Sequence, residues 1–227
     1  MKQAKIVKRF SVRKAHDAQL DMSKKIILQD RLPRKIRFVC GVDVAYIKDM
    51  SIGAVAVVDF DSLELVESQT AVCKTVFPYI PTLLSFREIR PAILCIRKLK
   101  TQPDVFLVDG HGFAHPYRCG FASHLGLLIH KSAIGVAKGQ LVRNAEIAKT
   151  SSNSTFFEHN GQMISAMIIT RKGSRPIYVS TGHMISLETA VKIVKQCTKQ
   201  SRMPEPILKA HEIAAQEKTK RSYSINI

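Results

Sequence analysis

Three strand patterns joined by short turns, followed by alternating strand and helix patterns, constrain the fold of this chain most strongly. Residues 36–76 hold three runs rich in β-branched residues, the first two joined by a connection that turns through Lys48–Met50 and the last two by a turn at Asp61–Ser62. Connections this short join neighbouring antiparallel strands. A strand, a helix and a second strand then alternate between residues 104 and 137. That alternation predicts parallel strands joined by a helical crossover.

The expected elements make an α/β fold with a mixed sheet flanked by helices. Three antiparallel strands followed by two parallel strands form the ribonuclease H-like arrangement, and a chain of 227 residues is expected to fold as one such domain, 1–227. Pro91 predicts a kink or a restart in the first helix after the meander. Strands are expected at 36–45, 53–60, 63–76, 104–108, 133–137, 162–170 and 176–179, helices at 83–99, 123–130, 187–200 and 205–220, and a surface loop or turn at 149–161.

The two ends of the chain carry weaker patterns. Residues 1–35 form a basic N-terminal extension in which Leu20, Met22 and the run Ile26–Leu28 predict one amphipathic helix. The tail 218–227 is expected to fray.

The charge balance points to a polyanionic partner. The chain has 35 Lys and Arg against 18 Asp and Glu, a formal net charge of +17. Nucleic acid is the first explanation, because neutralised phosphates release counterions, and an anionic membrane surface is the alternative. No apolar run approaches the roughly 20 residues that span a bilayer. Met1–Lys14 lacks the apolar core of a signal peptide, so a cytoplasmic protein is the default, as is a monomer.

The cysteines indicate neither a zinc site nor a disulfide framework. Their number, five, is odd, and no two of them form a CxxC pair. We expect most of them to be small buried hydrophobic residues.

Three acidic residues follow one another on successive elements of the predicted sheet. Asp43 lies in the first strand, Glu88 on the helix and Asp109 at the end of the fourth strand. This order suits a nuclease that holds a divalent metal, because hard cations select oxygen ligands. Taken singly, each acid has an ordinary alternative as a solvated or paired surface carboxylate.

Five ordered motifs resemble those of the endonuclease V family. The resemblance is dense from Gly41 to Lys138 and thinner through Thr181–His183 and Pro204–His211. The motifs are Gly41–Tyr46, Tyr79–Pro81 with Leu84–Glu88, Val108–Gly112 with His115–Pro116, Gly120–Gly126, and Ile134–Lys138.

The resemblance implies a Mg²⁺-dependent endonuclease, with Mn²⁺ as an alternative cofactor. Family members recognise hypoxanthine, the base of inosine, and cut the second phosphodiester bond on its 3′ side, chiefly in DNA repair, while some prefer RNA. The matching positions imply the following roles: metal ligands Asp43, Glu88 and Asp109; His211 at a fourth position that is Asp or His; a catalytic lysine, Lys138; and an aromatic wedge, Tyr79.

Substrate contacts are expected around the Asp109–Gly112 turn. Its backbone amides, unencumbered by side chains, could hydrogen-bond a purine edge. Candidate pocket and phosphate-contacting residues are Leu84, Gly110, Gly112, His115 and His183, and each histidine has packing as its ordinary alternative. The basic residues expected to grip phosphates without sequence preference include Lys5, Lys8, Arg9, Lys24, Lys25, Arg34, Lys35 and Arg37.

Two positions depart from the family pattern. Thr82 follows Pro81 where relatives usually have Gly, and threonine restricts close backbone approach to a ligand. Ile207–Leu208 stands where Thr-Arg is common, which removes a polar contact next to His211. Two other hypotheses therefore accompany the inosine-directed nuclease: a nuclease that selects DNA structure, such as flaps or junctions, and a nucleic-acid-binding module without catalysis.

Overall fold

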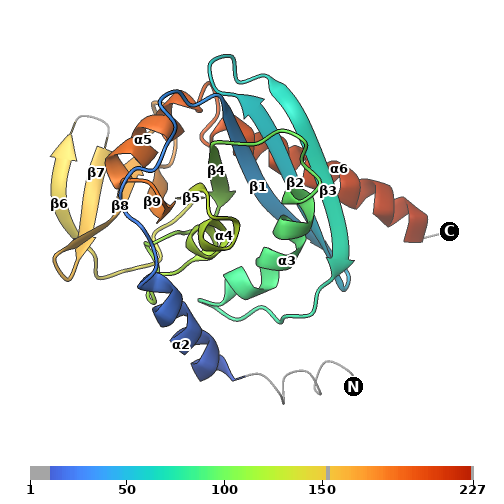
Figure 1. Cartoon of the computed structure of the whole chain (residues 1–227), viewed down its shortest axis with the longest axis horizontal. Helices are drawn as coiled ribbons and strands as arrows, with labels where there is room; N and C mark the ends of the chain where they lie inside the picture. Colours follow the sequence, from blue (N-terminus) through green and yellow to red (C-terminus); the bar gives the residue numbers. More distant parts are fainter. Residues whose placement is uncertain (1–10, 152–153, 226–227) are drawn as a thin grey trace.

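The computed structural model describes residues 11–151 and 154–225 and contains a nine-stranded mixed sheet with helices on both faces (Figure 1). The strand order is β3-β2-β1-β4-β5-β9-β8-β7-β6. The strands are β1 (Phe38–Ile47), β2 (Met50–Asp59), β3 (Leu65–Lys74), β4 (Val105–Asp109), β5 (Ser132–Ala137), β6 (Glu146–Ser151), β7 (Ser154–His159), β8 (Gln162–Ile168) and β9 (Ile177–His183). The helices are α2 (Val12–Ser23), α3 (Leu84–Ile96), α4 (Phe121–Ile129), α5 (Leu187–Gln196) and α6 (Glu205–Ile225).

The predicted ribonuclease H-like strand order is confirmed. β1, β2 and β3 pair antiparallel, and β4 and β5 then add in parallel beside β1. The remaining strands, β9, β8, β7 and β6, extend the sheet by antiparallel pairing from β5 outwards.

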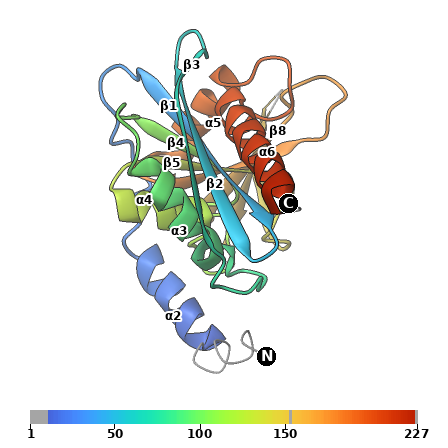
Figure 2. The same cartoon turned by 90° about the vertical axis from the view of Figure 1, so that its right-hand side faces the viewer.

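Alternation along the central strands separates two hydrophobic layers. Val39 packs with α5 and α6, whereas Cys40 and Val42 pack with α3 and α4. Figure 2 shows the sheet between α6 on one side and the α3–α4 pair on the other. Successive side chains of β1 point to opposite faces of the sheet, so they enter both layers. This explains why β1 is apolar without interruption up to Asp43.

The prediction of a loop at 149–161 is wrong. β6 and β7 occupy most of that stretch, and residues 152 and 153 between them lie outside the described residues. β6 is an edge strand whose six residues are all exposed. It therefore has no buried face to impose an apolar alternation, and backbone pairing to β7 alone defines it.

Both ends of the chain differ from expectation. α2 ends at Ser23, so Ile26–Leu28 lie beyond it, and Ile27 accepts the Met184 amide through its carbonyl. The buried residues of α2 are Ala15 and Gln19, whereas Leu20 is 43% exposed. α6 continues to Ile225, past the predicted end at residue 220, and its last turns extend beyond β3 (Figure 1).

Three further expectations concern Pro91, the cysteines and membrane-spanning helices. α3 runs unbroken through Pro91, so no restart occurs there. All five cysteines are buried, where most were predicted to be, and each is a free thiol. No helix in residues 11–151 and 154–225 is long and apolar enough to cross a bilayer.

Glu67 on β3 caps the turn that follows α3, and its loss is expected to destabilise the fold. It accepts the amides of Lys100 (3.0 Å) and Thr101 (2.8 Å). Desolvation of the carboxyl opposes these contacts, yet the hydrogen bonds lower the pKa of Glu67 from 4.5 to about 2. A depressed folded-state pKa adds stability above the ordinary pKa, and this stability is lost as pH falls through the folded value. Glu67→Gln should therefore cost about 1–3 kcal/mol of unfolding free energy at pH 7 and progressively less between pH 4.5 and pH 2.

Urea denaturation at pH 7 and pH 3 checks this expectation. Glu64→Gln, at an exposed position on the same hairpin, is the matched control and should follow the native chain at both pH values. A Glu67→Gln curve that keeps the same offset from the native chain at pH 7 and pH 3 would contradict the linkage.

Candidate active site

Three carboxylates from three elements lie together at the carboxyl ends of β1 and β4. The two strands are parallel neighbours, with Val42 paired to Val108, so Asp43 and Asp109 come next on adjacent strands. Glu88 is on the buried face of α3 and is 7% exposed. The carboxyl end of parallel strands is where open α/β sheets place their sites.

Glu88 experiences the charge of both aspartates. Burial raises the pKa of Glu88 to about 8, and Asp43 and Asp109 push it in the same direction. The Tyr46 hydroxyl donates to Glu88 Oε1 at 3.0 Å, and the Arg87 guanidinium, 4.3 Å from the Tyr46 ring centroid, also favours the ionised form. A cation near the three carboxylates would relieve their repulsion.

Each aspartate is contacted by a basic side chain from another element. Lys138, directly after β5, donates from Nζ to Asp109 Oδ2 at 2.8 Å. His211 of α6 places Nδ1 2.8 Å from Asp43 Oδ2. The side chains of Asp109 and Asp43 are 19% and 13% exposed. Those of their partners, Lys138 and His211, are 55% and 64% exposed. The two basic side chains can therefore reach a ligand that arrives from solvent.

The donor set suits a hard divalent cation, although it is not arranged as a closed metal site. Across residues 11–151 and 154–225, no group of three or more His, Cys, Asp or Glu side chains is positioned to hold a metal ion. Asp43 and Asp109 instead contact His211 and Lys138. Three carboxylates that repel one another fit Mg²⁺ or Mn²⁺ chemically, because these ions prefer oxygen ligands.

A cavity of about 230 Å³ is lined by residues of α3, which carries Glu88, and of the segment that follows Asp109. Ser85, in its wall, is three residues before Glu88 on α3, and His111, also in its wall, is two residues after Asp109. Its wall combines apolar and aromatic side chains with a few polar ones, as is usual in small-molecule sites. The lining residues are Tyr79, Thr82, Leu84, Ser85, His111, His115, Gly120, Phe121 and Leu141.

Three of the predicted substrate-contacting residues line this cavity. Tyr79 is 69% exposed, and Leu84 lies at the start of α3. His115 is buried, and desolvation lowers its pKa to about 4, so its imidazole is neutral at pH 7.

The structure does not bring the other three predicted residues to the cavity in the expected way. The Gly110 amide donates to the Val136 carbonyl at 3.1 Å, and the Gly112 amide donates to Ser180 Oγ at 2.9 Å. The expectation that these two amides are open to a purine edge is therefore wrong. His183 is 2% exposed and accepts the Ile27 amide through Nδ1 at 3.3 Å, so it is not part of the proposed site.

Three more residues belong to the site: Tyr46 and Ser85, which had no predicted role, and Thr82, which was predicted to restrict close backbone approach to a ligand. Tyr46 and Ser85 stood within the motifs but carried no chemical signal of their own. Ser85 Oγ is buried with no hydrogen-bond partner among the described residues, and it lines the cavity. Thr82 also lines the cavity and has φ of 72°, a conformation that costs a non-glycine residue roughly 1–2 kcal/mol.

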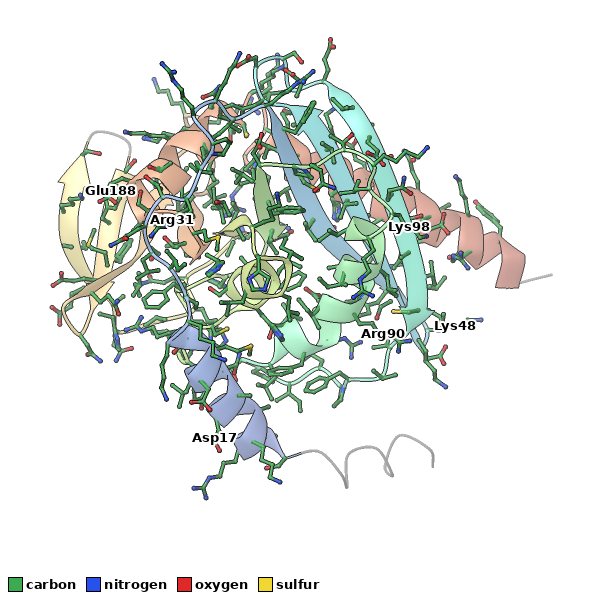
Figure 3. All side chains as sticks on the ribbon, viewed as in Figure 1. Asp17, Arg31, Lys48, Arg90, Lys98 and Glu188 are labelled. Atoms are coloured by element: carbon green, nitrogen blue, oxygen red, sulfur yellow. The ribbon has the colours of Figure 1, made fainter. Side chains whose placement is uncertain are left out.

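Exposed basic side chains lie on several parts of the molecule. Figure 3 labels four of them: Arg31 before β1, Lys48 in the β1–β2 turn, Arg90 on α3 and Lys98 just after α3. Lys24 and Lys35 pair with Asp21 and Asp61. The predicted phosphate contacts Lys24, Lys25, Arg34, Lys35 and Arg37 are all exposed, whereas Lys5, Lys8 and Arg9 lie outside the described residues.

Comparison with known proteins places this site in one family. A family model described as Endonuclease V matches residues 20–212. The endonuclease V of Thermofilum pendens is 41% identical over 212 residues, which cover 93% of this chain and 90% of the relative.

Solved structures agree with the sequence comparison. The endonuclease V of Streptomyces avermitilis superposes with a TM-score of 0.85 at 31% identity. The match covers 93% of this chain and 95% of the Streptomyces chain. An endonuclease V variant of Ciona intestinalis, solved with a 23mer DNA containing an inosine followed by a ribo-adenosine, gives a TM-score of 0.83 at 33% identity, covering 92% and 97%. The chain therefore belongs to the endonuclease V family and is an endonuclease.

Proposed function

We propose that this endonuclease recognises hypoxanthine in inosine-containing nucleic acid, chiefly DNA, and hydrolyses the second phosphodiester bond on the 3′ side. Its role would be the repair of deaminated adenine. The Ciona relative bound to inosine-containing DNA supports this substrate. The observation that carries the proposal is the cavity that shares α3 and the β4–α4 turn with the carboxylates Glu88 and Asp109. A base held in the cavity would leave its downstream phosphates beside those acids.

Base recognition is assigned to the cavity wall. Hypoxanthine has an acceptor at O6 and a donor at N1, the reverse of adenine at these two positions. Ser85 Oγ, buried without a partner among the described residues, can serve either group, because a hydroxyl both donates and accepts. Tyr79, exposed at 69%, would replace the stacking that is lost when the nucleotide leaves the strand.

Asp43, Glu88 and Asp109 are proposed to hold Mg²⁺, with Mn²⁺ as an alternative. When bound, such an ion lowers the pKa of an attacking water and neutralises charge on the departing oxygen. The water oxygen bonds to phosphorus as the water gives up one proton to His211 or to solvent, the bond from phosphorus to O3′ breaks, and O3′ takes up one proton, leaving 3′-hydroxyl and 5′-phosphate ends.

Lys138 and His211 act on the same phosphate in this proposal. The Lys138 ammonium, which contacts Asp109, can turn to a non-bridging oxygen and stabilise its developing charge. When Nδ1 of His211 is protonated and donates to Asp43, Nε2 is the nitrogen that can exchange a proton with water or with the leaving oxygen.

Cleavage of matched oligonucleotides tests the proposed function. DNA and RNA strands with one inosine, or adenosine in its place, are incubated with Mg²⁺ or with EDTA. We expect a Mg²⁺-dependent nick one nucleotide beyond inosine, at least about 10-fold faster than any cut in the adenosine strand. The faster polymer identifies the preferred nucleic acid.

The main competing outcome is cleavage directed by DNA structure. Equal cutting of inosine-free branched DNA and inosine DNA would replace the base-specific proposal with a structure-selective nuclease. No nick in either polymer with Mg²⁺ or Mn²⁺ would reject inosine-directed cleavage altogether.

A further inference from the structure

Helix α2 forms side-chain hydrogen bonds to the backbone and side chain of the cavity wall. Gln19, fully buried, donates from Nε2 to the carbonyls of Thr82 and Cys119, both at 2.9 Å. His16 Nε2 lies 2.9 Å from Thr82 Oγ1. These contacts join segments 63–100 residues apart in sequence, and Thr82 and Gly120 on those segments line the cavity. Figure 1 shows α2 at the end of the molecule next to α4.

Thr82 needs such support because of its backbone conformation. Its φ of 72° lies in the left-handed region, which is unfavourable for a β-branched residue. A residue in that region keeps its conformation only when its surroundings hold it there. His16 holds the hydroxyl of Thr82 and Gln19 holds its carbonyl.

His16 makes a second contact, with Tyr117. Its ring stacks on Tyr117 with centroids 3.9 Å apart and planes 13° from parallel. Tyr117 donates its amide to Nδ1 of His115, which lines the cavity. The imidazole of His16 therefore contacts both Thr82, in the cavity wall, and Tyr117, whose amide is bonded to the wall residue His115.

His16 and Gln19 precede residue 20, where the match to the family begins. We propose that both are positioning residues for base recognition. They hold Thr82 in the left-handed conformation and thereby set the shape of the cavity wall. This inference rests on the proposed function, because it assigns the base to that cavity.

Removing the His16 contact should raise KM for the substrate more than it lowers kcat. The carboxylates lie on β1, α3 and β4, which α2 does not carry, so the reacting groups stay in place. Loss of one hydrogen bond corresponds to a rise of roughly 3- to 10-fold in KM for the inosine strand, with kcat changed less than about 2-fold. The preference for inosine over adenosine should fall by a similar factor.

A double-mutant cycle tests the coupling between His16 and Thr82. Thr82→Gly removes the hydroxyl and makes φ of 72° acceptable, so His16→Ala should be nearly silent in that background. His16→Gln can keep a polar atom near Thr82 Oγ1 without the ring, and should restore KM. Asp17→Asn, at an exposed position on α2 labelled in Figure 3, is the matched control and should keep the native preference.

Equal effects of His16→Ala in the native chain and in the Thr82→Gly variant, or no effect in either, would overturn the inference. Hydrogen–deuterium exchange over residues 79–86 tests, without nucleic acid, whether His16 holds the segment around Thr82. Exchange should be at least about 3-fold faster in His16→Ala than in Asp17→Asn, and equal exchange would also overturn it. If the native chain did not cut inosine strands but exchange were faster in His16→Ala, the proposed function would be rejected. The role of His16 in holding Thr82 would then stand on its own.

Discussion

Asp109→Asn is expected to lower the rate of Mg²⁺-dependent cleavage of an inosine strand by on the order of 10³-fold. The substitution keeps the shape of the side chain but removes one of the three negative charges proposed to hold the ion. It also removes the charge that Lys138 contacts at 2.8 Å. The measurement is single-turnover cleavage across a range of Mg²⁺ concentrations.

The same substitution should leave the fold intact. The Asp109–Lys138 contact involves a lysine that is 55% exposed, and such pairs contribute little to stability. Burial is the main cause of the raised pKa of Glu88, and neutralising Asp109 removes one of the two aspartate charges that add to it. We therefore expect an unchanged or higher melting temperature, as is common where a site concentrates like charges.

Asp61→Asn is the matched control for this prediction. Asp61 is also paired with a lysine, Lys35 at 3.3 Å, on an exposed turn. Its substitution should leave cleavage at the native rate. An Asp109→Asn chain that retained more than about a tenth of native activity would contradict a metal-holding role for Asp109.

Gly41→Ala is expected to destabilise the protein by about 3 kcal/mol or more. A Cβ at Gly41 would overlap the carbonyl of Pro206, where α6 begins. The obstacle is backbone, so no change of rotamer can relieve it, and β1 and α6 must separate. Because α6 carries His211, cleavage should fall as well. Urea denaturation measures the first effect and single-turnover cleavage the second.

Gly139→Ala is the control for the effect of adding a methyl group. No heavy atom lies within 4 Å of a Cβ built there. Its unfolding free energy should stay within about 0.5 kcal/mol of the native value. If Gly41→Ala were as stable as Gly139→Ala, the close approach of β1 and α6 would not constrain the fold.

The sequence by itself determined the order of the elements from β1 to β5 and the three acids on β1, α3 and β4. Those signals are local: β-branched runs, short turns and an acid at the end of an apolar strand. Tyr79 and Leu84, which line the cavity, were predicted to contact substrate, Tyr79 through the family resemblance.

Only the tertiary structure decided which groups remain open to a ligand. The Gly110 and Gly112 amides are already bonded to Val136 and Ser180, on β5 and β9, and the local sequence does not specify these pairings. β6 exists only through its pairing with β7. Gln19 is buried because two distant carbonyls accept its amide, a pairing that no apolar periodicity records. Hydrogen-bond partners far apart in sequence, and the burial that makes those bonds necessary, are properties of the folded chain alone.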